Sequence, residues 1–208
     1  RVRAARRIAK EHGLHFVENW PMPVLGIDCV IMEVPAGRSL EAVTAALSAL
    51  PDVAWSQPIN RSHVEGAKAV PMSAGPNDQL YPAQPASQQW QLDRLHDFAT
   101  GRGITIAVID SRVDAAHPDL AGQISSSQNF AGEANRAAER HGTGVAGIIA
   151  ARANNSVGIV GVAPGARVMA LRACWERPGG GTVCDSLSIA KALSFAIDRH
   201  ANIINLSL

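Results

Sequence analysis

The sequence predicts an α/β protein in which a parallel β-sheet domain follows a small α+β domain. Residues 104–109 form an almost continuous apolar run that ends on Asp110, as expected for a strand buried on both faces of a parallel sheet. After this run, helix-like and strand-like stretches alternate, which favours parallel strands joined by right-handed crossovers. Before it, residues 65–91 are rich in Gly, Pro, Ala, Asn and Gln, so we expect a linker or extended surface segment there.

The first part, residues 1–64, is expected to contain two helices and three strands. Ser39 can cap a helix that runs to Ala49 with apolar residues at helical spacing. The full set of expected elements is a helix over 2–12, strands over 14–18, 28–34 and 53–57, and the helix after Ser39. Such short alternation suggests a small sheet with helices on one face.

The second part continues after the strand 104–109 with two further helices and two further strands. We expect helices over 141–152 and 187–199 and strands over 167–173 and 202–208. The apolar stripe of the second helix consists of Leu187, Ala190, Leu193 and Ile197. Because functional groups of parallel sheets gather at the carboxyl ends of the strands, Asp110 is a candidate site residue.

Composition excludes several classes of protein. With 47% hydrophobic and 18% charged residues, the 208-residue chain can build a packed core. A net charge of +1 argues against a broad nucleic-acid-binding surface. The basic cluster in residues 1–10 fits the solvated face of an amphipathic helix better than a membrane- or nucleic-acid-binding arm. No run of 18 apolar residues exists, so no membrane span is expected.

Three cysteines bear on the compartment. Cys174 and Cys184 bracket a short Gly/Pro-rich loop, which suits a disulfide and an oxidising environment. The alternative is three reduced, partly buried thiols. No Cys-x-x-Cys pair or Cys/His cluster indicates zinc.

The stretch HGTGVAGIIA, residues 141–150, supports two incompatible interpretations. Its glycines spell G-x-G-x-x-G, the pattern of a dinucleotide-binding loop, but such a loop needs a buried strand immediately before it. Residues 132–140 are polar and charged and contain no β-branched residue, so a dinucleotide-dependent oxidoreductase is a distant possibility. The other interpretation is a reactive histidine, His141, at the start of a helix whose glycines allow close packing.

Three motifs in order resemble the subtilisin-like serine proteases (subtilases, peptidase S8). They are DSRVDAAHPDL at 110–120, HGTGVAGIIA at 141–150 and GIVGVAPGA at 158–166, within a resemblance from about residue 77 to residue 208. The resemblance implies that Asp110 is the aspartate and His141 the general base of an Asp–His–Ser triad, in the order known for the family. The histidine would accept the serine proton, and the carboxylate would orient the imidazole.

The family's nucleophilic serine and oxyanion-hole asparagine lie in motifs that these residues do not contain. We therefore expect both termini to be truncations of a longer precursor, and the chain itself to hydrolyse no peptide bonds. Arg112 stands where the family usually has glycine, which is awkward if that position needs a positive φ. A catalytically dead binding or scaffold protein with the same fold is the main alternative.

The resemblance also implies where a substrate would bind. An extended peptide would pair with two strand edges, one at Gly180, Gly181 and Thr182 and the other at Ser207 and Leu208.

A calcium site is implied as well, with an ordinary Asn/Gly turn as the alternative. The residues implied to bind Ca²⁺ through oxygen atoms are Asp78, Asp119, Ala153, Asn155, Val157 and Ile159.

Residues 1–64 resemble the inhibitor-I9-like, ferredoxin-like propeptide of these proteases, most clearly at LPDVAWSQPIN, residues 50–60. This implies three parts: a propeptide at 1–64 that inhibits its own protease, a linker at 65–77 that contains the maturation cleavage region, and the N-terminal part of the peptidase domain at 78–208. The resemblance further implies secretion and peptide or protein substrates.

Overall fold

In the computed structural model, the described residues are 2–23, 26–59, 61–64, 76–132 and 137–208. The contacts divide the chain into two compact units, Arg1–Asn60 and Arg61–Leu208. Each unit has its own apolar core. No helix among these residues is long and apolar enough to cross a bilayer.

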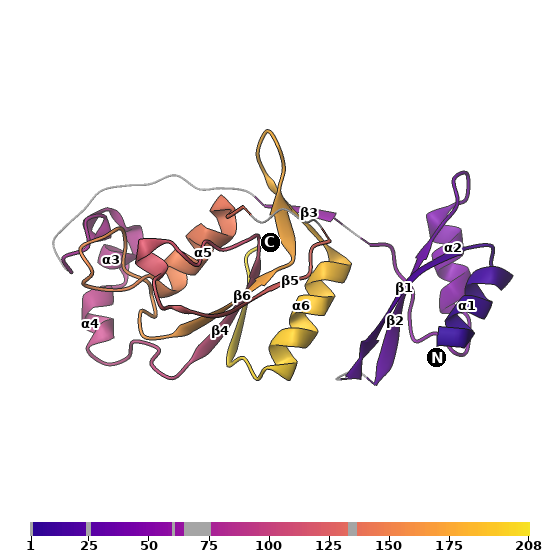
Figure 1. Cartoon of the computed structure of the whole chain (residues 1–208), viewed down its shortest axis with the longest axis horizontal. Helices are drawn as coiled ribbons and strands as arrows, with labels where there is room; N and C mark the ends of the chain where they lie inside the picture. The colour runs from indigo at the N-terminus through magenta and orange to yellow at the C-terminus, as the bar shows by residue number, and fades with distance from the viewer. Residues whose placement is uncertain (1, 24–25, 60, 65–75, 133–136) are drawn as a thin grey trace. The chain divides into compact units, whose positions relative to one another are not determined.

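The N-terminal unit is a β-hairpin with two helices (Figure 1). Its elements in chain order are α1 (Val2–Glu11), β1 (His15–Met22), β2 (Ile27–Glu33) and α2 (Leu40–Ser48). Its core joins Ala9, Leu14 and Val43. As expected, the Ser39 hydroxyl caps α2, accepting the N–H of Ala42. The strand expected over 53–57 is wrong: these residues form no strand, and Trp55 is 55% exposed, so no alternation with a buried face develops.

The second unit is built on a four-stranded parallel sheet in the order β5-β6-β4-β9. The strands are β4 (Thr105–Asp110), β5 (Ile124–Asn129), β6 (Arg167–Arg172) and β9 (Ile203–Leu206). Alternate residues of β4 point to opposite faces. Ile106 and Val108 pack toward α5 (Arg140–Ala150), whereas Ala107 and Ile109 pack toward α6 (Ser186–Asp198). The predicted parallel α/β architecture is confirmed, with helices on both faces of the sheet (Figure 1).

The apolar stripe expected for α6 is only partly its buried face: Leu193 packs against the core, as expected. Ile197 is 47% exposed, whereas Ala192 and Ala196 are fully buried against the sheet. Small side chains let this helix approach the strands closely, and the larger residues Ile189, Leu193 and Phe195 fill the flanks.

A second, antiparallel sheet has the order β3-β8-β7; β7 and β8 follow β6 along the chain, whereas β3 precedes β4. It contains β3 (Arg61–Val64), β7 (Cys174–Glu176) and β8 (Thr182–Asp185). The loop expected between the two cysteines is thus the turn of a β7–β8 hairpin, and β3 pairs with the outer side of β8.

The Pro-rich segment that was expected to be a linker forms regular structure in its described residues, 76–91. It forms the short helices η2 (Tyr81–Ala83), α3 (Pro85–Gln89) and α4 (Leu92–His96), and another 3₁₀ turn, η3 (Pro118–Leu120), follows β4. Tyr81 is 2% exposed and packs with Leu92 and Val160. The linker interpretation is therefore wrong for residues 78–91, because prolines that start short helices also occur in packed segments. The rest of the expected linker falls mainly on residues 65–75, outside the described residues.

Candidate active site

Asp110 and His141 meet at the carboxyl end of the central strand. Asp110 is the last residue of β4 and is 1% exposed, and His141 lies in the first turn of α5. His141 Nδ1 is 2.8 Å from Asp110 Oδ1. This contact leaves Nε2 as the ring nitrogen that can exchange a proton with another group.

The environment of Asp110 sets its acidity. Burial raises the pKa of the Asp110 carboxyl above its usual value, and the hydrogen bonds with His141 and the Ser111 N–H offset only part of this effect. Oδ2 is buried and has no partner among the described residues. The carboxylate is thus poorly hydrated, which strengthens its interaction with a positively charged imidazole.

Close packing between the loop after β4 and α5 brings the two residues together. The Gly142 N–H donates to the Ser111 hydroxyl at 2.9 Å. A Cβ atom on Gly142 would lie 2.2 Å from the Ser111 carbonyl oxygen, so any side chain would push the helix away. Gly144, by contrast, has no atom within 4 Å of such a Cβ. The expected packing role therefore applies to Gly142 and not to Gly144.

Arg112 causes no backbone strain. It is not among the non-glycine residues with positive φ, which are Gln91, Asn154, Ser156 and His200 in the described chain. Its carbonyl accepts the Glu139 N–H at 2.9 Å. The awkwardness expected from replacing the usual glycine does not arise.

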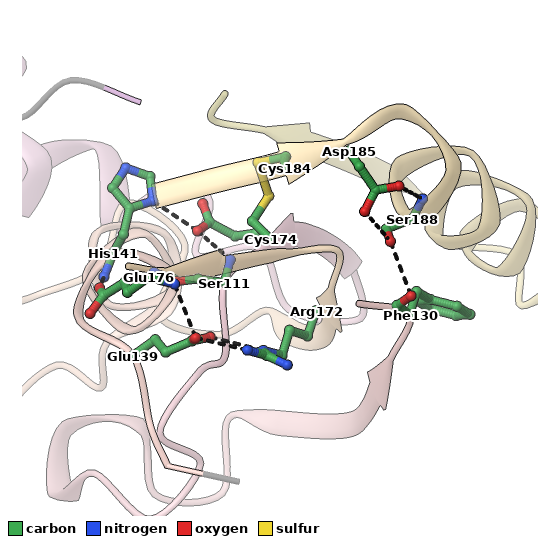
Figure 2. Close-up of a disulfide and its surroundings, with 12 residues drawn as sticks. Ser111, Phe130, Glu139, His141, Arg172, Cys174, Glu176, Cys184, Asp185 and Ser188 are labelled. Atoms are coloured by element: carbon green, nitrogen blue, oxygen red, sulfur yellow. Dashed lines mark hydrogen bonds and ion pairs between the residues drawn. A yellow bond between two sulfur atoms is a disulfide. The ribbon is translucent and has the colours of Figure 1, made fainter. Parts of the chain in front are cut away.

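A buried ion pair that the sequence did not reveal lies below His141 (Figure 2). Glu139 and Arg172 are 5% and 3% exposed and are joined by two hydrogen bonds of 2.8 and 2.9 Å. Burial alone would raise the pKa of Glu139, but Arg172 and the backbone N–H groups of Arg112 and Glu176 together lower it. The only sequence signal was a charged residue, Arg172, at the end of an apolar strand.

The predicted disulfide partners are bonded in the structure. Cys174 and Cys184 lie directly opposite each other on β7 and β8, and both are fully buried. Glu176 of the same hairpin accepts the His141 N–H at 2.8 Å, which places this hairpin against the start of α5 (Figure 2).

The predicted substrate-binding residues lie at two separate strand ends. Gly180 and Gly181 are exposed in the β7–β8 turn, and Thr182 begins β8. Ser207 and Leu208 follow β9, the outer strand next to β4. The Ser207 hydroxyl donates to Asn205 Oδ1 and makes no contact with His141 among the hydrogen bonds of the described residues.

Among the predicted calcium ligands, the side-chain oxygens of Asp78, Asp119 and Asn155 accept hydrogen bonds. Asp78 accepts the N–H groups of Asn154 and Asn155, and Asp119 accepts Asn155 Nδ2 and the Ile159 N–H. The Val157 N–H donates to Asn155 Oδ1. Ala153 packs with the Tyr81 cluster. In the described chain, no three His, Cys, Asp or Glu side chains form a metal-binding group. Calcium at these residues stays a prediction.

Comparison with known proteins identifies the family. Residues 101–208, more than half of the chain, match Peptidase S8, the subtilase family. The chain belongs to the subtilase family. Over 174 residues it is 39% identical to the thermophilic serine proteinase of Bacillus sp. (strain AK1), a match that covers 82% of this chain and 40% of that protein.

Two other relatives agree. Thermitase of Thermoactinomyces vulgaris is 38% identical over 136 residues, covering 64% of this subtilase chain and 47% of thermitase. The crystal structure of fervidolysin from Fervidobacterium pennivorans, described as a keratinolytic enzyme related to subtilisin, has a TM-score of 0.65 at 24% identity. That match covers 99% of this chain and 34% of fervidolysin, and it shows the fold. The chain thus spans less than half the length of these relatives.

Proposed function

We propose that this chain is part of a serine endopeptidase precursor and supplies two members of its triad. The 2.8 Å contact between His141 Nδ1 and Asp110 carries the proposal. In the proposed reaction, Nε2 of His141 accepts the proton of the serine hydroxyl as that oxygen attacks the substrate carbonyl carbon. The proton then passes to the leaving amine, and Asp110 stabilises the imidazolium that exists between the two steps.

The nucleophilic serine and the oxyanion-hole asparagine are proposed to belong to parts of the protein that these 208 residues do not include. Two facts support this: the family's Gly-Thr-Ser motif does not occur here, and the chain covers 40% of the AK1 proteinase. We therefore expect the 208-residue chain to show no peptidase activity. Turnover by this chain that Ser207→Ala abolishes would contradict the assignment.

The experiment that tests the proposal is turnover by the protein that carries these residues together with the serine motif. His141→Ala should lower kcat on a chromogenic peptide anilide by at least about a thousandfold, because the triad acts as a unit. His117→Ala is the matched control: its Nδ1 accepts the Asp119 N–H in the turn before η3, away from Asp110. The alternative, a catalytically dead subtilase used for binding, predicts no turnover by the unchanged protein and a substitution at the motif serine.

The N-terminal unit is proposed to be an inhibitory propeptide. The segment immediately after it, β3, pairs antiparallel with β8 over four residue pairs, from Arg61–Asp185 to Val64–Thr182. Thr182 belongs to the proposed substrate edge, so this tail lies along a strand that an extended peptide would use. The coverage of 99% of the chain by the fervidolysin match also includes this unit.

The remaining proposals concern substrate, metal and location. Peptide or protein substrates would pair with residues 180–182 and 207–208, and at Thr182 they would have to replace the pairing with Val64 of β3. Calcium would stabilise the region of Asp78, Asp119 and Asn155. A melting temperature that changes with neither added calcium nor a chelator would contradict this.

Secretion is supported by the Cys174–Cys184 disulfide, since such bonds persist in oxidising compartments.

A further inference from the structure

The first turn of α5 is capped in an unusual way. Glu139 occupies the N-cap position, where a side chain ordinarily accepts an N–H of the first turn, yet its side chain makes no such bond. The N–H groups of His141 and Gly142 are capped from other elements, by Glu176 and Ser111. The Glu139 carboxylate instead turns inward to Arg172 (Figure 2).

In that inward position, both oxygens of Glu139 are fully used. Oε1 accepts Nη2 of Arg172 at 2.8 Å and the Glu176 N–H at 3.1 Å. Oε2 accepts Nε of Arg172 at 2.9 Å and the Arg112 N–H. A carboxylate has about four acceptor positions, so Glu139 accepts all four donors at once.

The partners of Glu139 belong to the segments that hold the proposed catalytic pair. Arg112 lies two residues after Asp110, and Glu139 itself lies two residues before His141. Glu176 caps the His141 N–H, and Arg172 is the parallel-sheet neighbour of Asp110. One buried carboxylate therefore connects the loop after β4, the start of α5 and β7.

We propose that Glu139, held by Arg172, is a positioning residue that keeps His141 in register with Asp110. The inference rests on the proposed function, since it assigns the network to the same site. Glu139 touches neither Asp110 nor the imidazole through any hydrogen bond of the described residues, so it acts through the backbone segments it joins. A purely stabilising ion pair is the competing explanation.

The spectroscopic test uses the 208-residue chain and requires no turnover. The Nδ1–H proton of His141, hydrogen-bonded to Asp110, should give a downfield NMR signal, which is assigned by its loss in His141→Gln. Glu139→Gln should abolish this signal or move it upfield, because an amide oxygen cannot serve both the Arg112 and Glu176 N–H groups. Gln123→Met is the matched control. It removes buried hydrogen bonds to Ala150 and Pro164 at the far end of α5, about 15 Å away, and should leave the signal in place.

A double variant separates the effect of Glu139 on the position of His141 from its effect on the stability of the fold. Glu139→Gln with Arg172→Met leaves no uncompensated buried charge, so it should recover the melting temperature lost in Glu139→Gln. If Glu139 is a positioning residue, the signal stays lost despite this recovery. A signal at the unchanged position in the folded double variant would overturn the inference, as would its absence from the unsubstituted chain.

The activity test keeps the two proposals distinguishable. In the protein that carries the serine motif, the double variant should lower kcat about tenfold to a hundredfold with little change in KM. If that protein is inactive without any substitution while the Glu139 variants still shift the His141 signal, the proposed function fails and the positioning role stands. An unchanged kcat in the double variant would overturn the positioning role alone.

Discussion

At the scale of single residues, the two glycines of HGTG offer a direct test of how the site is assembled. Gly142→Ala should destabilise the fold by about 1–3 kcal/mol, because its methyl group would overlap the Ser111 carbonyl oxygen and force α5 away from β4. Gly144→Ala is the matched control: nothing lies within 4 Å of its Cβ, and alanine favours a helix over glycine by up to about 1 kcal/mol. Urea denaturation of both variants measures the difference. Equal effects would show that the approach of Ser111 to the helix is not as close as described.

Local sequence predicts some residues of the candidate site and not others. Asp110 ends an apolar strand and His141 starts a glycine-rich helix, so each carries its own local signal, and the structure places them 2.8 Å apart. Local sequence gives little indication that Glu139 and Arg172 form a buried pair. The two residues are 33 positions apart, and Glu139 stands in a polar stretch typical of a surface loop. A buried charge is recognisable only when its partner is known.

At the scale of elements, the β7–β8 hairpin depends on its cross-strand disulfide. Replacing Cys174 and Cys184 together by alanine should lower the free energy of unfolding by about 2–4 kcal/mol, because the bond constrains the unfolded chain. Urea denaturation with and without reductant measures this: reductant should destabilise the unsubstituted chain and leave the double variant unchanged. Cys29→Ala is the control, since Cys29 is outside the disulfide. A reductant effect that persists in the double variant would contradict the assignment.

Elements were predictable where hydrophobic pattern and burial agree. The apolar strand β4 was expected, whereas β5 was not. Five of the six residues of β5 (ISSSQN) are Ser, Gln or Asn, and these five are exposed at the edge of the sheet. In α6 the expected stripe was only partly correct: Leu193 packs against the core, but Ile197 is exposed, and the fully buried residues are Ala192 and Ala196. The face of α6 that packs against the sheet depends on how closely helix and sheet approach in the folded protein, and the spacing of apolar residues does not encode that distance.

At the scale of the whole molecule, β3 is predicted to hold the N-terminal piece of the chain to the rest after cleavage of the segment that follows β3. With a specific protease site introduced at residues 68–72, the two cleaved pieces should co-elute in size-exclusion chromatography. Ser62→Pro with His63→Pro should separate them, because proline donates no ladder hydrogen bond and successive N–H groups of a strand point in opposite directions. Ser56→Pro with Gln57→Pro, outside any strand, is the control and should leave the pieces together. Separation of the unsubstituted pieces, or co-elution of the β3 variant, would mean that this pairing does not hold the proposed propeptide.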